Sequence, residues 1–228
     1  MIDAHTHILP AMDDGARDVQ ISEQMIECEL QSGVSLIAAT PHFYPSIMTP
    51  SEFLARRDES AERIKDHKDH VLLGAEVQYY DGICRMDGIE RLCIEGTKLF
   101  LLELPFVAWD SRVIDNVSSL CEREEIVLVL AHIDRYFKIQ KAPMIEKIME
   151  TGALLQFNAE AFLNPFSRKK AIAMFEDGLC AMLGSDAHNM SSRKPNLAKA
   201  KEIIVSKTSK EIFEKHERKE SEIFGINN

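Results

Sequence analysis

The sequence contains no long hydrophobic run. Its apolar stretches reach only about seven residues, whereas a helix that spans a bilayer needs roughly 20. No leader with a charged start and an apolar centre precedes the first strand-like stretch. We therefore expect neither membrane insertion nor secretion. The five cysteines are odd in number and have no CxxC spacing, a usage typical of a reduced, cytoplasmic protein.

Positive charge is also scarce. The 27 Lys and Arg residues face 37 Asp and Glu residues, which gives a formal net charge of −10 and a pI near 5.3. This balance argues against a general nucleic-acid binder or a partner of anionic membranes, because both kinds of binding depend on positive charge. It leaves room for a local positive site.

Two nucleophile motifs are missing as well. The phosphate-cradling pattern CxxxxxR does not occur: Cys180 is followed by AMLGS and Cys93 by IEGTK. No GxSxG motif is present either. Covalent catalysis by a cysteine or a serine therefore has no visible candidate.

What the chain does contain is a series of seven short apolar runs of strand length. They show no clear alternation, and charged segments of helical length separate most of them, which is typical of parallel strands covered on both faces. The runs cover residues 1–7, 34–40, 71–77, 98–104, 126–132, 153–158 and 179–185. We predict an α/β protein of βα units, with residues 1–228 as one domain.

Capping residues mark the helical segments between these runs. The candidate N-caps are Thr49 or Ser51 and Asp110 or Ser111. Glycines that fit helix C-termini stand just before three runs, at Gly33, Gly152 and Gly178. Residues 207–228 are typical of an amphipathic terminal helix with a frayed end.

Each apolar run ends in a polar side chain. His5 and His7 end the first run, and residues i and i+2 of a strand share a face, so their imidazoles project side by side. The later runs lead to His42, Glu76, Glu103, His132, Asn158, and Asp186 with His188. Strand C-termini are where a βα barrel builds its active site. Asn158 is expected either to orient water or a ligand or to satisfy backbone groups.

With Asp14 these side chains give nine candidate metal ligands, which is too many for one ion. Their mixed nitrogen and oxygen chemistry without thiolate suits Mn, Fe, Co or Zn in a catalytic site. Three divalent ions would leave about +2 against the four carboxylates, a charge that attracts a dianion such as a phosphate ester. The other histidines, His67, His70 and His216, lie in charged helical stretches and are expected to face solvent.

Seven motifs occur in the order HTH, DDG, TPH, GAE, LLE, AHIDRY and SDAHN. This ordered set resembles the polymerase and histidinol phosphatase (PHP) superfamily over residues 1 to about 200. The opening DAHTHILPAMDDG, the AHIDRY stretch and SDAHN followed by Arg193 are most similar to the manganese-dependent bacterial protein-tyrosine phosphatases of capsule and exopolysaccharide systems. The resemblance implies a distorted (β/α)7 TIM-like barrel, the PHP fold, with a three-metal site.

The resemblance also implies a division of the ligands. The implied sets are His5, His7 and Asp186 for one ion, Glu76 as a bridge to a second ion completed by Glu103 and His132, and Asp14, His42 and His188 for the third. Asp13 is the alternative to Asp14, which we favour because it directly precedes the glycine of the motif. Arg135 and Arg193 match arginines that hold phosphate in these enzymes, and an ordinary surface salt bridge is the alternative for each.

The activity implied is hydrolysis of phosphotyrosine on a bacterial tyrosine kinase or on capsule or exopolysaccharide regulatory proteins, with Mn²⁺ as the cofactor. We expect attack by a metal-bound hydroxide without a covalent intermediate, with Arg135 neutralising phosphoryl oxygens. A tyrosine phenolate leaves with a pKa of about 10 and needs less help from a general acid than an alkoxide does. A site without an obvious acid therefore favours aryl phosphates.

Aromatic residues follow several candidate ligands. They are Tyr44, Tyr79, Tyr80, Phe106, Trp109 and Tyr136. We predict that they form an apolar rim around a charged floor, suited to a ring that carries a phosphate. The alternative is that they pack across the top of the barrel.

Three other functions are alternatives to this one. The first is a small-molecule phosphoesterase of the same fold, such as a histidinol-phosphate phosphatase. A non-catalytic, metal-bound regulatory domain is disfavoured because all nine ligand positions carry competent side chains. An amidohydrolase also begins with HxH, but its bridging lysine is missing. The sequence leaves the physiological substrate, the native metal, the general acid and the oligomeric state open.

Overall fold

The structure, a computed structural model, describes residues 1–226. The strands of this part are β1 (Ile2–Thr6), β2 (Leu36–Ala39), β3 (His42–Phe43), β4 (Val71–Leu73), β5 (Glu76–Gln78), β6 (Leu99–Glu103), β7 (Val127–Leu130), β8 (Leu154–Asn158) and β9 (Met182–Gly184). All pairings are parallel, in the orders β1-β2-β4 and β3-β5-β6-β7-β8-β9. The predicted run 71–77 is divided between β4 and β5, and the run 34–40 forms β2 and is followed by the short strand β3.

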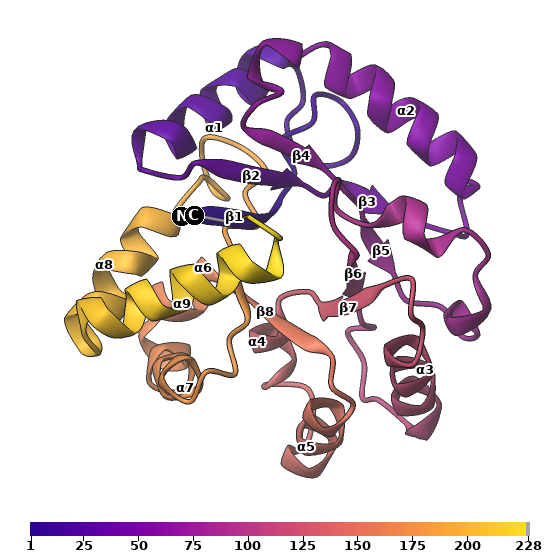
Figure 1. The fold of residues 1–228 in the computed structure, drawn as a ribbon, viewed down its shortest axis with the longest axis vertical. Helices are drawn as coiled ribbons and strands as arrows, with labels where there is room; N and C mark the ends of the chain where they lie inside the picture. Colours follow the sequence, from indigo (N-terminus) through magenta and orange to yellow (C-terminus); the bar gives the residue numbers. More distant parts are fainter. Residues whose placement is uncertain (227–228) are drawn as a thin grey trace.

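Helices surround the curled sheets on the outside (Figure 1). They are α1 (Val19–Gln31), α2 (Pro50–Glu62), α3 (Ser111–Cys121), α4 (Ile133–Tyr136), α5 (Ala142–Glu150), α6 (Ala159–Leu163), α7 (Pro165–Glu176), α8 (Leu197–Lys207) and α9 (Lys210–Ile223), with 3-10 turns η1 (Lys65–His67), η2 (Ile83–Arg85) and η3 (Ile89–Leu92). None of the helices within residues 1–226 is long and apolar enough to cross a membrane.

The helix termini carry the predicted caps. Thr49 forms a capping box with Glu52 at the start of α2, and Asp110 caps α3. The three predicted glycines follow their helices in the left-handed conformation that glycine tolerates, at Gly33, Gly152 and Gly178. These local signals are confirmed because they depend only on neighbouring residues.

The two sheets meet between β1 and β9, which closes the barrel. Thr6 bridges Ala187, and the N–H of His7 donates to the carbonyl of Ala187 (2.9 Å). On the other side of the same junction, the N–H of Asp186 donates to the carbonyl of His5 (2.8 Å). The fold is thus the curled parallel α/β barrel that the sequence predicts, and its closure sets the first strand against the last.

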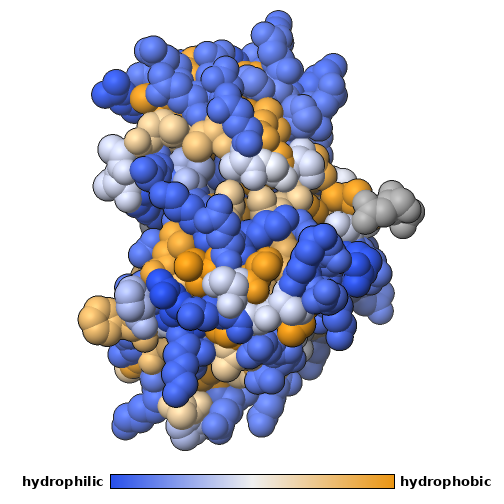
Figure 2. Space-filling view, turned by 90° about the vertical axis from the view of Figure 1, so that its left-hand side faces the viewer, coloured by the Kyte–Doolittle hydropathy of each residue, from blue (hydrophilic) through white to orange (hydrophobic). Residues whose placement is uncertain are grey.

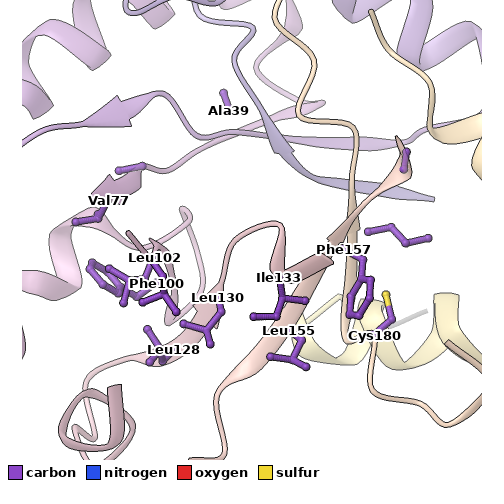
Figure 3. Packing of buried hydrophobic residues seen from close by; sticks show 14 of the residues in the cluster. Ala39, Val77, Phe100, Leu102, Leu128, Leu130, Ile133, Leu155, Phe157 and Cys180 are labelled. Carbon is purple, nitrogen blue, oxygen red and sulfur yellow. The ribbon is translucent and has the colours of Figure 1, made fainter. Parts of the chain in front are cut away.

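Alternate residues of the strands feed two separate apolar layers. Phe100, Leu128 and Leu155 belong to the larger layer between sheet and helices (Figure 3). Leu101 follows Phe100 on β6, and Val129 follows Leu128 on β7. Both belong to a smaller cluster that also contains Ile2, Ala4, Met182 and Phe224. Because one face of each strand serves the helix layer, the other face is left to the barrel interior and the site at its end.

Helix α9 crosses the end of the barrel at which β1 begins (Figure 1). Its inward face buries Phe213, His216 and Glu220, so the prediction that His216 faces solvent is wrong. The ring of His216 packs on Phe175 (centroids 4.6 Å apart), and burial together with the charge of Lys219 lowers its pKa to about 4. A neutral imidazole here behaves as an apolar side chain.

The other two histidines in charged helical stretches and the five cysteines lie outside the candidate site. His70 is exposed and His67 partly so. All five cysteines are free thiols. The face shown in Figure 2 is mostly hydrophilic, with apolar residues only in small groups between, in keeping with the charged composition of the chain.

The pH dependence of stability should reveal the buried Glu220. Its Oε1 accepts from the N–H of Leu183 (2.9 Å), and burial raises its pKa to about 8 from an ordinary value of 4.5. Between these values the folded state holds a proton that the unfolded chain has lost, so stability falls as the pH rises, by up to about 1.4 kcal/mol per pH unit. We expect Glu220→Gln to flatten this part of the profile in urea unfolding measured from pH 5 to 8. Parallel profiles for the two proteins would contradict the assignment.

Candidate metal centre

The carboxylate of Glu76, at the start of β5, lies at the centre of the candidate site. Its Oε1 is 2.8 Å from Nε2 of His132, and its Oε2 is 2.9 Å from Nδ1 of His42. The Nε2 atoms of His5 and His7 both lie 3.3 Å from Oε2. Glu76 is 1 % exposed. Four histidines from three separate parts of the chain therefore surround one buried carboxylate.

Ligand atoms from the nine candidates gather around this carboxylate. Three groups have atoms within 4.8 Å of one another: His5, His7 and Asp186; His7, Asp14, His42 and His188; and His42, Glu76 and Glu103. His132 completes the cluster, with its Nε2 also 3.5 Å from Glu103. The first group has the composition of one implied ligand set. In the third, His42 stands where the resemblance implies His132.

Two of these residues stand in strained backbone conformations. His132 has φ 32° and Asp186 has φ 52°, both in the left-handed region. A side chain held in such a rare conformation costs about 1–3 kcal/mol and persists where the surroundings enforce it. The N–H of His132 is fixed by Gln156 Oε1 (2.6 Å) and the N–H of Asp186 by the carbonyl of His5. These contacts hold the chain where it turns from strand to loop.

The orientation of three imidazoles is set through Nδ1. In His5 this atom contacts Gln156 Oε1 (3.2 Å), and in His7 it contacts Asp13 Oδ2 (2.6 Å). In His188 it faces the backbone carbonyl of Asp186 (2.9 Å). A proton held on Nδ1 by an acceptor leaves Nε2 as the free lone pair, which is the arrangement found in metal-binding histidines.

The spacing of the free nitrogens suits an ion. The Nε2 atoms of His5 and His7 are 3.2 Å apart. Atoms that each lie about 2.1 Å from one ion stand about 3.0–3.5 Å from each other in tetrahedral or octahedral geometry. Asp186 Oδ1 lies 4.0 Å from the first nitrogen and 3.5 Å from the second. These three side chains can therefore converge on one cation with small adjustments.

The positions of the two neighbouring acids separate their roles. Asp13 is almost buried, holds His7 and also accepts from the N–H groups of Gly15 (2.9 Å) and His42 (2.8 Å). Asp14 is exposed, and its Oδ1 lies 3.4 Å from Nε2 of His188. The first carboxylate is thus saturated by the protein, whereas the second has free oxygens directed at the cluster.

The two buried carboxyls of the cluster, Glu76 and Asp186, both have a lowered pKa and are therefore ionised at neutral pH. Burial raises the pKa of Glu76, but the charge of His5 and the hydrogen bond from His132 outweigh it and hold the pKa well below its usual range. For Asp186, burial is likewise outweighed by the charges of His5 and Arg135, which lower the pKa. Carboxylates in this form are competent ligands for hard and borderline divalent cations.

The histidines carry unequal proton loads. Burial lowers the pKa of His7, but Asp13 more than offsets this and raises it to about 10. In His132, burial is outweighed by hydrogen bonding to Glu103 and by Glu76, so its pKa rises to about 9. Burial and the charge of His7 lower the pKa of His188 to about 4. A divalent cation could displace the first two protons, because metal binding and proton release are coupled.

The donor set fits a divalent metal. Among the residues that the structure describes, Nδ1 of His132 and Nε2 of His188 are buried without a hydrogen-bond partner. Buried polar atoms are normally paired, so the unpaired Nε2 of His188, which belongs to the cluster and lies 3.4 Å from Asp14 Oδ1, indicates a ligand. In His132 the nitrogen that faces the carboxylates of Glu76 and Glu103 is Nε2. The set mixes nitrogen and oxygen and contains no thiolate, which suits Mn, Fe, Co or Zn.

Two arginines border the cluster. Arg135 NH2 pairs with Asp186 Oδ2, and Arg193 NH2 lies 2.8 Å from Asp186 Oδ1. Their side chains are 36 % and 38 % exposed. Each guanidinium has five N–H donors, so donors remain for an anion that enters from solvent.

Sequence reasoning missed Gln156, which forms an amide pair with Asn158 on β8. Gln156 Nε2 donates to Asn158 Oδ1 (3.0 Å), and Asn158 Nδ2 donates to Asp186 Oδ2 (2.9 Å). Asp134 Oδ1 accepts from the N–H of Asn158 (2.9 Å). Asn158 therefore orients a candidate ligand, one of the two roles expected for it. Gln156 lies two residues earlier on the same strand face, and that spacing is the signal by which it could have been found.

The aromatic rim is only partly as predicted. Phe106 is 47 % exposed and stacks on His132 (centroids 5.6 Å apart), and the partly buried Tyr44 stacks on His42 (5.2 Å). Tyr79 and Tyr80 are also partly buried. Tyr136, which packs on Phe106, and Trp109, which packs on Tyr136, are in contrast buried, so placing them on the rim is wrong. Tyr136 donates to the carbonyl of Leu104 and supports the loop from below.

Two glycines permit close approach of the chain to the first strand. A Cβ on Gly15 would lie 2.1 Å from the carbonyl oxygen of His7. A Cβ on Gly184 would lie 2.7 Å from Cβ of His5 and 2.7 Å from Nε2 of Gln156. Real Cβ atoms essentially never approach other atoms below 3.0 Å, so any larger residue must displace a candidate ligand or its support.

Fold and donor set together define a βα-barrel protein with a candidate metal centre at the C-terminal ends of its strands. The chain belongs to the family "Capsular polysaccharide synthesis, CpsB/CapC", whose family model matches residues 1–222.

Similar proteins agree with this assignment. Tyrosine-protein phosphatase YwqE of Bacillus subtilis is 29% identical over 229 residues, covering 93% of this chain and 87% of its own. A chain from the crystal structures of YwqE from Bacillus subtilis and CpsB from Streptococcus pneumoniae, described as unique metal-dependent tyrosine phosphatases, superposes with a TM-score of 0.84 at 25% identity, covering 100% of this chain and 96% of that one. The histidinol phosphate phosphatase of Lactococcus lactis shares the fold alone (TM-score 0.58, 12% identity, coverage 90% and 92%).

Metal analysis of two variants tests the roles of the adjacent acids. We expect Asp14→Asn to lower the amount of Mn²⁺ bound per chain at saturation, because it weakens a side chain that faces the cluster. Asp13→Asn should keep that amount and weaken affinity about 10- to 100-fold, since it affects the support of His7 and of the backbone at Gly15 and His42 but removes no proposed ligand. The reverse pattern would make Asp13 the ligand.

Gly184→Ala tests the close approach of β9 to β1. The added methyl group must push His5 or Gln156 away, so we expect weaker Mn²⁺ binding in calorimetry together with lower stability. Gly33→Ala is the matched control, because its φ of 92° strains alanine while nothing lies within 4 Å of the new atom. Gly33→Ala should lower the stability of the protein but leave its Mn²⁺ affinity unchanged. Equal Mn²⁺ affinity in all three proteins would refute the argument.

Proposed function

We propose that the protein is a metal-dependent protein-tyrosine phosphatase, a phosphoric monoester hydrolase. The observation that carries this proposal is the buried Glu76 with four histidine nitrogens within 3.3 Å, bordered by Arg135 and Arg193. Such a site combines ligands for divalent cations with donors for an anion. The names of the similar proteins, which are tyrosine-protein phosphatases, support the same function.

The proposed metal ligands are those expected from the sequence. They are His5, His7, Asp14, His42, Glu76, Glu103, His132, Asp186 and His188. We propose three ions with Mn²⁺ as the native metal, and the mixed nitrogen and oxygen set supports this class of metal while also admitting Fe, Co or Zn. When bound, such ions acidify water to supply the nucleophile and neutralise charge in the transition state.

The arginines bind the phosphoryl group in this proposal. Arg135 and Arg193 approach the same carboxylate, Asp186, and their side chains are 36% and 38% exposed. Phosphoryl oxygens that enter from solvent would be bound there by charge-assisted hydrogen bonds. No residue has an evident general-acid role among those described. A phenolate leaving group suits such a site because it departs without full protonation.

The substrate is proposed to be phosphotyrosine on a protein, with a bacterial tyrosine kinase or a capsule or exopolysaccharide regulator as the partner. Membership of the capsular polysaccharide synthesis family supports this setting. We further propose that residues 1–228 act as one phosphatase domain in the cytoplasm. One continuous apolar layer joins strands and helices along the chain, which supports a single domain.

Hydrolysis assays test the function directly. We expect C-terminally tagged protein with Mn²⁺ to hydrolyse p-nitrophenyl phosphate and a phosphotyrosine peptide, and EDTA to abolish both activities. His5→Ala should be inactive. Arg135→Ala should lose about 10- to 100-fold in kcat/KM, the value of a charge-assisted hydrogen bond.

Arg112→Ala is the matched control, because this arginine is 69% exposed and pairs with Asp110 on the surface. It should keep full activity. Hydrolysis of histidinol phosphate and not of the peptide would favour the small-molecule phosphoesterase. If the protein is folded and metal-loaded but hydrolyses no ester, the alternative of a non-catalytic, metal-bound regulatory domain would be favoured.

A further inference from the structure

Two aromatic rings stand on histidines at opposite oxygens of Glu76. His132 contacts Oε1 of this carboxylate and carries Phe106, with ring planes 25° apart. His42 contacts Oε2 and carries Tyr44, with ring planes 26° apart. The candidate metal centre therefore has a stacked aromatic ring on each side.

The loop that carries Phe106 is held by specific hydrogen bonds. Trp109 Nε1 donates to the carbonyl of Pro105 (3.0 Å). Gln140 Nε2 donates to the carbonyl of Val107 (2.6 Å), and its Oε1 accepts from the N–H of Trp109 (2.9 Å). Carbonyls on both sides of Phe106 are thus fixed. A loop built in this way holds its central side chain in place.

Phe106 is nevertheless left half exposed. Tyr136, on which Phe106 packs, and Trp109, which packs on Tyr136, are 0% and 5% exposed, whereas Phe106 is 47% exposed. Its ring packs on Tyr136 (centroids 4.9 Å apart) and presents its remaining surface beside His132. Exposed apolar surface on a rigid loop at a polar site is typical of a binding position.

We propose that Phe106 and Tyr44 are specificity-determining residues that contact the aromatic ring of the substrate and select aryl over alkyl phosphates. This inference rests on the proposed phosphatase function. The phosphoryl group is held at the cluster and the arginines, and the ring to which it is attached extends outward past the histidines, where these two side chains lie. An alkyl group offers no aromatic face to them.

The selectivity can be measured without hydrolysis. Phenylphosphonate and methylphosphonate are non-hydrolysable aryl and alkyl probes with the same anionic group. We expect the Mn²⁺-loaded protein to bind the phenyl compound more tightly in calorimetry. Phe106→Leu and Tyr44→Leu, which keep apolar volume without a ring, should each lower the ratio of the two affinities about three- to tenfold, the size of one aromatic pair.

Conservative and neighbouring variants separate ring contact from structural support. Tyr44→Phe retains the ring and should restore the preference lost in Tyr44→Leu. Val107→Ala and Ile47→Ala change residues that are 61% and 71% exposed, and should keep the parental ratio. The Mn²⁺ content of every variant is measured in parallel.

Each outcome decides. A lower ratio in the leucine variants with full Mn²⁺ content supports the proposal. An unchanged ratio, or equal weakening of both phosphonates, overturns it, because the rings would then only support the histidines. A parent protein that binds neither phosphonate and hydrolyses no ester rejects the proposed function itself. Normal hydrolysis of aryl esters without any phenyl preference rejects the aromatic selection alone.

Discussion

The structure depends on the electrostatics of one carboxylate. Glu76 is buried, and an isolated charge at such a depth is costly, yet four histidines approach its two oxygens within 3.3 Å. These histidines come from β1, β3 and the end of β7, so the charge is satisfied only when the barrel has closed. Folding and assembly of the candidate site are therefore the same event.

Supporting residues hold this cluster in place. Asp13 fixes His7, Gln156 fixes His5 and the backbone of His132, and Asn158 fixes Asp186. Each candidate ligand concerned has its second polar atom or its backbone engaged by the protein. This arrangement limits the loss of side-chain freedom on binding a ligand, which is how a site is preorganised.

Much of the barrel and of the convergence at its rim could be predicted from the sequence. A histidine or acid directly after an apolar run is visible locally, and parallel strands bring their ends together. Contacts between distant residues were not visible in the same way: Gln156 meets His5 across 151 positions. The burial of His216 was not predicted because most residues of its helix are charged or polar, so the sequence gives little sign of the inward face that packs on Phe175. The burial of Tyr136 was not predicted because its position four residues after His132 does not reveal that Phe106, from another loop, packs on it.

The alternation along β6 has a consequence for folding fidelity. Phe100 and Leu102 face the helix layer, while Leu99 and Leu101 face the barrel interior and Glu103 reaches the site. A slip of one residue would move Glu103 into the apolar layer and place Leu102 among the carboxylates and imidazoles. Every residue on the strand would then be on the wrong side. The polar cluster thus disfavours a shifted register of β6, and this effect is independent of any reaction at the site.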